Sequence, residues 1–308
     1  MDISLLFFSI GSFLIFLGSN LLVDNSKLIA KNLGVSPIVI GLTVIALGTS
    51  LPELVVSVLA SLKDESDVVI GNVMGSNISN IALVLPLILF IKPITINHSL
   101  VSNNLYYLLL TSGLFIVLLI SNFLNYLSGL LLLLLFIYFI KNQIEEIESD
   151  HQNSSLNSKN FKYSHLFYIL IGIIMLGYGA ELFISGAIGI ATFFGIPLIV
   201  ISLSVVALGT SLPELITSIV AIKKNEPSFV IGNIIGSNII NIVLVLGASV
   251  ILNPINIYYS EILISILIFI IATLFFSFIS FNRNVLSKLD GFILFIIYLI
   301  FIYFNFMY

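Results

Sequence analysis

Ten blocks of about 20 apolar residues, separated by polar stretches, make up most of the 308-residue chain. Each block can cross about 30 Å of hydrocarbon as an α-helix, and none shows the ten-residue alternation of a membrane β-barrel. Only 8% of the residues are charged, whereas soluble globular proteins carry about 25%. The chain is therefore not a soluble enzyme, a nucleic-acid-binding protein or a disordered protein, and we predict an all-α polytopic protein of the lipid bilayer. The predicted spans are residues 4–23, 36–61, 68–91, 102–120, 124–140, 166–190, 197–222, 230–252, 259–280 and 287–307.

The lysines and arginines orient these spans, because cytoplasmic connections carry an excess of both. With ten spans, consecutive connections alternate between the two sides of the membrane. One side receives ten of the 11 basic residues and the other receives Lys63 alone. We therefore predict a multi-pass protein of the cell membrane with both termini outside and the polar 141–165 linker in the cytoplasm. The ten residues are Lys27, Lys31, Lys92, Lys141, Lys159, Lys162, Lys223, Lys224, Arg283 and Lys288.

A long internal repeat is the most informative feature of the sequence. Residues 40–85 align with residues 201–246 without a gap at a constant offset of 161, and 29 of 46 positions are identical. Each copy contains the segments G-T-S-L-P-E-L and G-N-x-x-G-S-N-I-x-N. A purely structural duplication explains the repeat less well, because helix packing would preserve the pattern of small residues and not the identity of the acids.

The repeat divides the chain into two five-span halves, residues 1–140 and 166–308, joined by the 141–165 linker. Because five is odd, the second half enters the membrane in the opposite orientation to the first. Inverted-topology repeats are the architecture of secondary transporters, whose site lies near the membrane midplane where the repeats meet. A channel built from duplicated halves is the weaker alternative.

One glutamate lies deep in the second span and another at the same place in the seventh, Glu53 and Glu214. A carboxylate at the centre of a membrane helix costs about 2.5–3.5 kcal/mol on insertion scales. Two acids at equivalent positions therefore indicate a shared site, although snorkelling or bonding between helices would also accommodate them. Each follows a proline, Pro52 or Pro213, which removes a helical hydrogen bond and kinks the helix. Main-chain oxygens near Thr49 and Thr210 can then point sideways at a cation.

Small polar residues accompany both glutamates at helical spacing. Ala46, Ser50 and Glu53 share one face, with Thr49 beside them, and Ser76 and Asn80 share a face of the third span. Close packing by small residues would also explain Ser76, and a hydrogen bond between helices would explain Asn80. The corresponding residues of the second repeat are Ala207, Thr210, Ser211, Glu214, Ser237 and Asn241.

The candidate ligands are carboxylate, hydroxyl, amide and main-chain oxygens, which suit hard cations such as Ca²⁺ and not soft transition metals. No ring of lysine or arginine lies in the membrane, which disfavours an anionic substrate. The chain has no cysteine and only three histidines, all in or beside polar connections, so we expect neither a thiolate nor a histidine metal cluster. Glu181 lies toward the outer end of the sixth span, and a solvated or gating role is as plausible there as a ligand role. We predict a plain polar turn for residues 64–67, whose acids would concentrate cations only weakly.

These motifs resemble the α-repeats of the sodium/calcium exchanger family, in the prokaryotic branch of the cation/calcium antiporter superfamily. The resemblance covers both repeats, and the five-plus-five layout covers essentially the whole chain. It implies a ten-helix fold with ion sites in helices 2, 3, 7 and 8. It also implies exchange of three Na⁺ for one Ca²⁺, with helices 1 and 6 sliding against the rest. We expect no cofactor other than the transported ions, no enzymatic activity, and a functional monomer.

The resemblance also implies roles for individual residues by motif position. Glu53 and Glu214 would be the shared acidic ligands, and Thr49 and Thr210 would offer main-chain oxygens to Ca²⁺. Asn80 and Asn241 would line the centre. The flanking Na⁺ ligands would be Ala46, Ser50, Ser76, Ala207, Ser211 and Ser237.

The sequence departs from the family pattern at Asn241, where many prokaryotic relatives and the potassium-dependent exchangers have aspartate. One possible negative charge is therefore missing, which makes K⁺ co-transport less expected and leaves Na⁺ selectivity open. A Ca²⁺/H⁺ antiporter of the same fold is the alternative, because a buried glutamate can take up a proton. That branch typically has a further glutamate in the G-N-x-x motif, where this chain has Gly75 and Gly236.

Overall fold

The computed structural model describes residues 2–153, 163–194, 207–256 and 259–307. Helices occupy all ten predicted spans, the seventh only from Ala207 onward because residues 197–206 lie outside the described residues. Seven described helices are long and apolar enough to cross a membrane, and one bent pair would make an eighth span. The helices are α1 (Asp2–Leu33), α2 (Pro37–Ile40), α3 (Ala46–Thr49), α4 (Leu51–Leu62), α5 (Ser66–Ser79), α6 (Leu85–Ile91), α7 (His98–Ile120), α8 (Tyr126–Asn153), α9 (Ser164–Phe193), α11 (Ala207–Thr210), α12 (Leu212–Lys223), α13 (Pro227–Ile240), α14 (Gly247–Leu252), α15 (Tyr259–Asn282) and α16 (Lys288–Met307).

In the described part of the chain, three wide π-helical turns interrupt the helices that carry the repeated motifs. They are η1 (Gly41–Ile45), η2 (Asn80–Val84) and η4 (Asn241–Leu246). Turns of this kind are rare and occur mostly as single interruptions of α-helices, frequently at functional sites. Two of the three begin at Asn80 and Asn241, which the family resemblance implies to line the centre of the candidate site.

The chain forms two compact units, residues 1–52 with 143–233 and residues 53–142 with 234–308. Each unit therefore contains segments from both sequence repeats. The two compact units do not correspond to the two sequence halves, residues 1–140 and 166–308. The division into those halves follows from the internal repeat and stays a prediction. Helix α8 continues to Asn153, into the predicted 141–165 linker, and α9 begins at Ser164.

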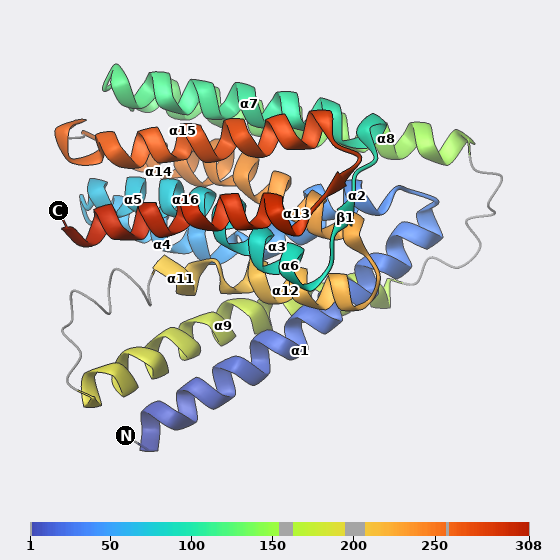
Figure 1. Cartoon of the computed structure of the whole chain (residues 1–308), viewed down its shortest axis with the longest axis horizontal. Helices are drawn as coiled ribbons and strands as arrows, with labels where there is room; N and C mark the ends of the chain where they lie inside the picture. Colours follow the sequence, from blue (N-terminus) through green and yellow to red (C-terminus); the bar gives the residue numbers. More distant parts are fainter. Residues whose placement is uncertain (1, 154–162, 195–206, 257–258, 308) are drawn as a thin grey trace. The chain divides into compact units, whose positions relative to one another are not determined.

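In the first unit, α1 and α9 lie side by side (Figure 1) and meet through glycines spaced seven residues apart. A Cβ atom added to Gly11 would lie 2.4 Å from the main-chain nitrogen of Phe183, and one added to Gly18 would lie 2.7 Å from the oxygen of Gly172. Such distances leave no room for a side chain. The two backbones therefore touch, which is how small residues join helices in membranes.

In the second unit, α7 packs against α15 (Figure 1), with an edge-to-face contact between Phe115 and Phe269 at 5.7 Å between ring centroids. A short antiparallel pair of strands, β1 (Ile94–Thr95) and β2 (Val285–Leu286), joins the connections that precede α7 and α16. The buried carboxylate of Asp290 accepts a hydrogen bond from the main-chain nitrogen of Ser287 at 2.8 Å. This bond caps the start of α16.

Helix α1 continues past the predicted end of the first span at residue 23 and reaches Leu33. The length of an apolar block indicates how much of a helix lies in hydrocarbon, but not where the helix ends. The prediction therefore did not include the polar continuation of α1 after residue 23. The helix ends at Gly34, whose φ of 67° lies in the left-handed region that glycine adopts without steric strain. The main-chain nitrogen of Val35 then donates to the oxygen of Ala30, which closes the helix end. Two ion pairs of 2.7 Å hold this polar end, Lys27 with Glu226 and Asp24 with Lys224.

Candidate functional site

The two helices that carry the repeated G-T-S-L-P-E-L segment break at the same residue of that segment. Ser50 has φ −84° and ψ 5°, and Ser211 has φ −85° and ψ 4°. In the second span the break bends the helix by 45° between Thr49 and Leu51. The predicted interruption before Pro52 and Pro213 is therefore present in both copies, because neither proline can continue the hydrogen-bond ladder of a helix.

Each break starts a new helix whose first turn carries the repeated glutamate. Glu53 lies in the first turn of α4 and Glu214 in the first turn of α12, and both side chains are 0% exposed. The positive end of a helix dipole favours a carboxylate at this position. The fold thus supplies part of the stabilisation that a charged group needs when it is removed from water.

The first unit brings residues of the two repeats into contact. The hydroxyl of Ser50 donates to Oε1 of Glu214 at 3.3 Å. The hydroxyl of Thr49 lies 3.1 Å from Oδ1 of Asn233, to which it donates, and 3.3 Å from the oxygen of Ala46. Thr210 and Ser211 are also buried and lie in the same unit. Ala207 begins α11, and its side chain lies outside the described part of the structure.

The second unit holds the other five predicted residues, all of them buried. The side-chain amides of Asn80 and Asn241 have no hydrogen-bond partner for either the nitrogen or the oxygen among the described residues. Both side chains are fully buried, so bulk water cannot supply the hydrogen bonds that the protein does not make. An unpaired buried polar group costs about 1–3 kcal/mol. The five residues are Glu53, Ser76, Asn80, Ser237 and Asn241.

The donor set of both units suits a hard cation. It consists of carboxylate, hydroxyl and amide oxygens, and none of the described lysines and arginines is buried. Among the described residues there is also no cluster of three or more His, Cys, Asp or Glu side chains. Ion binding would therefore depend on two acids supplemented by neutral oxygens. Each unit is described by itself, so the joining of the two sets into one site stays a prediction.

Two asparagines of the G-N segments contact the candidate ligands and were missed from the sequence. Asn72 donates to the main-chain oxygen of Glu53 at 3.0 Å and to the hydroxyl of Ser57 at 2.8 Å. Asn233 donates to Ser218 at 3.3 Å and accepts from Thr49. The signal was available in the repeat, because Asn72 and Asn233 are identical at the offset of 161.

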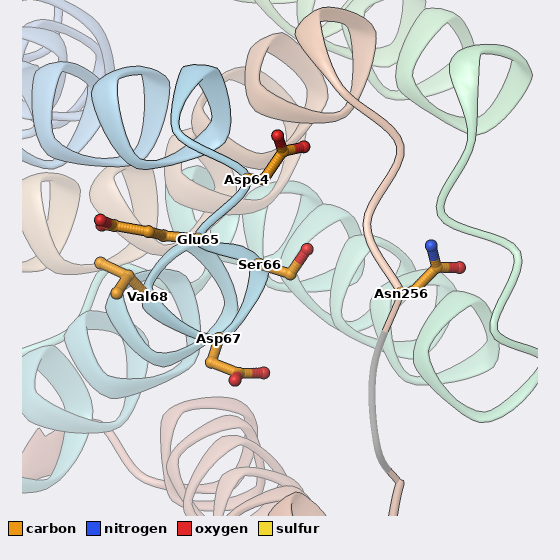
Figure 2. Close-up of a pocket in the computed structure, with 6 residues that line it drawn as sticks. All are labelled: Asp64, Glu65, Ser66, Asp67, Val68 and Asn256. Atoms are coloured by element: carbon orange, nitrogen blue, oxygen red, sulfur yellow. The ribbon is translucent and has the colours of Figure 1, made fainter.

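The remaining acids considered from the sequence lie apart from these contacts. Glu181 is exposed on α9. Residues 64–68 line an open pocket of about 370 Å³ together with Asn256. Figure 2 shows the carboxylates of Asp64, Glu65 and Asp67 pointing in different directions, so they do not converge on one point. The side-chain amide of Asn253 donates to Asp64, and Asp64 has a φ of 62° at the end of α4, as a helix-terminating turn requires.

The helical fold and its buried acids define the class as a polytopic membrane transporter, and comparison with known proteins shows the family. The family model described as sodium/calcium exchanger protein matches residues 3–144 and again residues 164–307. The chain belongs to the sodium/calcium exchanger family, whose members are ion antiporters and not enzymes. This confirms the family suggested by the motifs.

Individual relatives resemble this chain over most of its length. Sodium/calcium exchanger MaX1 of Methanosarcina acetivorans is 32% identical over 283 residues, covering 78% of this chain and 80% of the relative. Inner membrane protein YrbG of Escherichia coli is 31% identical over 255 residues, covering 80% and 78%. The solved structure of the sodium-calcium exchanger NCX_Mj, soaked with Na⁺ and Sr²⁺, is 33% identical with a TM-score of 0.84, covering 96% of this chain and 97% of that chain.

The match with NCX_Mj confirms the predicted fold class, an all-α polytopic membrane protein of ten helices in two inverted-topology repeats.

Proposed function

We propose that this chain is a secondary active antiporter that exchanges Na⁺ for Ca²⁺ across the cell membrane as a monomer, by alternating access. The ions bind between the two repeats, at residues contributed by the second, third, seventh and eighth spans. Glu53 and Glu214 supply the charge, and neutral oxygens complete the coordination. The proposed ligands are Ala46, Thr49, Ser50, Glu53, Ser76, Asn80, Ala207, Thr210, Ser211, Glu214, Ser237 and Asn241.

The observation that supports this proposal most strongly is that the buried side-chain amides of Asn80 and Asn241 lack hydrogen-bond partners among the described residues. Both amides are buried, and all four of their polar atoms lack a partner among the described residues. Buried polar groups in native proteins are nearly always hydrogen-bonded, so we infer that a bound ion or water satisfies these two amides. A hard cation that takes oxygen ligands satisfies such carbonyl oxygens.

The charge of the site explains why exchange would be obligatory. Glu53 and Glu214 together carry −2, while Asn80 and Asn241 add no charge. One Ca²⁺ neutralises the site, and three Na⁺ leave it at +1. The loaded forms can cross between the inward and outward states, whereas the empty site would carry an uncompensated charge through a low-dielectric region.

The test is ⁴⁵Ca²⁺ uptake into proteoliposomes that contain the purified protein. We expect uptake that requires internal Na⁺, that does not change when K⁺ is added or omitted, and that is electrogenic if three Na⁺ exchange for one Ca²⁺. The control is an imposed pH gradient without Na⁺. Uptake driven by the pH gradient alone would contradict the proposal and identify a Ca²⁺/H⁺ antiporter, and discrete single-channel currents would identify a channel.

The proposed orientation places both termini outside and the 141–165 linker in the cytoplasm, from the distribution of lysine and arginine. The chain has no native cysteine, so single cysteines report their own position. We expect Asp67→Cys to react with an impermeant thiol reagent in intact cells and Ser155→Cys, which lies outside the described residues, to be protected. Equal labelling rates at the two positions would overturn this orientation.

A further inference from the structure

A second pair of repeated asparagines, Asn72 and Asn233, remains outside the proposed ligand set. Each donates its side-chain amide to the corresponding serine of its own repeat, Asn72 to Ser57 and Asn233 to Ser218. Those serines are also related by the offset of 161. The same asparagine–serine hydrogen bond therefore occurs twice, once in each compact unit. Its formation does not depend on the surroundings of either copy alone.

Each asparagine also makes a second bond that leads directly to a proposed ligand. Asn72 donates to the main-chain oxygen of Glu53 at 3.0 Å. Asn233 accepts the hydroxyl of Thr49 at 3.1 Å, and Asn233 is 1% exposed. The polar atoms of one short side chain thus connect the kinked helix that carries a ligand to a neighbouring helix.

The backbone around Asn233 shows why this short side chain reaches its partner. A Cβ atom added to Gly232 would lie 2.5 Å from the oxygen of Ile38 and 2.9 Å from Cα of Gly41. The start of α13 and the second span therefore touch at Gly232 and Gly41. The same two segments are also joined next to Gly232, where the hydroxyl of Thr49 donates to Oδ1 of Asn233.

We propose that Asn233, with Asn72 as its counterpart in the first repeat, is a positioning residue that sets the place of the ion ligands without binding the ion. This inference rests on the proposed function, because its readout is ion binding at the same site. Thr49 is held by a hydroxyl that donates to Asn233, and its main-chain oxygen is the group proposed to face Ca²⁺. Removing the amide frees the turn that aims this oxygen.

The experiment is a double-mutant cycle with Asn233→Ala, Thr49→Val and the double variant, measured by ⁴⁵Ca²⁺ exchange in proteoliposomes. Each single variant is expected to raise the half-saturating Ca²⁺ concentration about tenfold, the effect of one lost hydrogen bond. The maximal rate and the half-saturating Na⁺ concentration should change less. The double variant should be no worse than the worse single variant, because both remove the same bond. Asn282→Ala is the matched control, since that exposed amide donates to the main-chain oxygen of Phe278 in its own helix and lies on α15, away from the proposed ligands.

The outcomes separate this inference from the function on which it rests. If the unmodified protein takes up no Ca²⁺ in exchange for Na⁺, the proposed function fails. If the unmodified protein exchanges normally and both single variants keep its half-saturating Ca²⁺ concentration, the positioning role is wrong. Independent effects that multiply to about a hundredfold in the double variant would also overturn it. Thr49→Val is nearly isosteric, so it keeps the test available if Asn233→Ala fails to fold.

Discussion

Glu53→Gln and Glu214→Gln are each expected to reduce Ca²⁺ exchange to background while the protein still folds. Both carboxylates are fully buried at the first turn of a helix, so neither is screened by water. At an effective dielectric constant of about 20 and a separation of about 4 Å, two unit charges attract by about 4 kcal/mol. The attraction of a carboxylate to a divalent ion is larger still, so its removal should weaken Ca²⁺ binding strongly. Glutamine keeps the shape of the side chain while removing its charge.

The measurement is initial ⁴⁵Ca²⁺ uptake under an imposed Na⁺ gradient, alongside the elution profile of each purified variant. Glu181→Gln is the matched control, because it is the same substitution at an exposed glutamate of α9, and we expect it to keep exchange. Ser57→Ala, one helical turn beyond Glu53, should have a smaller effect than either glutamate variant. Exchange near the unmodified rate in Glu53→Gln or Glu214→Gln would move the site elsewhere.

Gly11→Ala is expected to destabilise the protein strongly through the pair formed by α1 and α9. The new Cβ atom would lie 2.4 Å from the nitrogen and 2.8 Å from Cα of Phe183, and 2.7 Å from the oxygen of Gly179. All three atoms belong to the backbone, so no rotamer change can relieve the overlap and the helices must separate. Overpacking of this kind costs about 1–3 kcal/mol and sometimes more.

Gly177→Ala in α9 is the control, because a Cβ atom there meets nothing within 4 Å. Alanine favours the helical state over glycine by about 1 kcal/mol, so this variant should be as stable as the unmodified protein or slightly more stable. The chain has no tryptophan, so the fraction of monodisperse protein after heating is a better measure than intrinsic fluorescence. Equal heat resistance of Gly11→Ala and Gly177→Ala would show that the two backbones do not touch.

The sequence predicted the elements of this fold well where hydrophobicity decides them. Apolar length predicted the spans, and Pro52 and Pro213 predicted the breaks at Ser50 and Ser211. Hydrophobicity did not predict where α1 ends, because the polar residues after Val23 continue the helix until Gly34 permits the left-handed turn.

For the candidate site, the sequence singled out Glu53 and Glu214 because a buried acid is costly and both copies carry one. The structure confirms that both are buried, and their role in ion binding stays a prediction. The contact of Ser50 with Glu214 and that of Thr49 with Asn233 depend on how helices from distant parts of the chain pack. No local pattern encodes those contacts. The π-helical turns were missed for the same reason, since residues 80–84 have an ordinary apolar helical composition.

The turns η2 and η4 also bear on the internal repeat. A π-helical turn amounts to one residue inserted into an α-helix, and these two begin at Asn80 and Asn241, which correspond at the offset of 161. The alignment of residues 40–85 with residues 201–246 has no gap, so neither copy gained or lost this residue alone. The wide turn therefore belongs to the repeated unit itself, and both halves of the chain carry it at the same position.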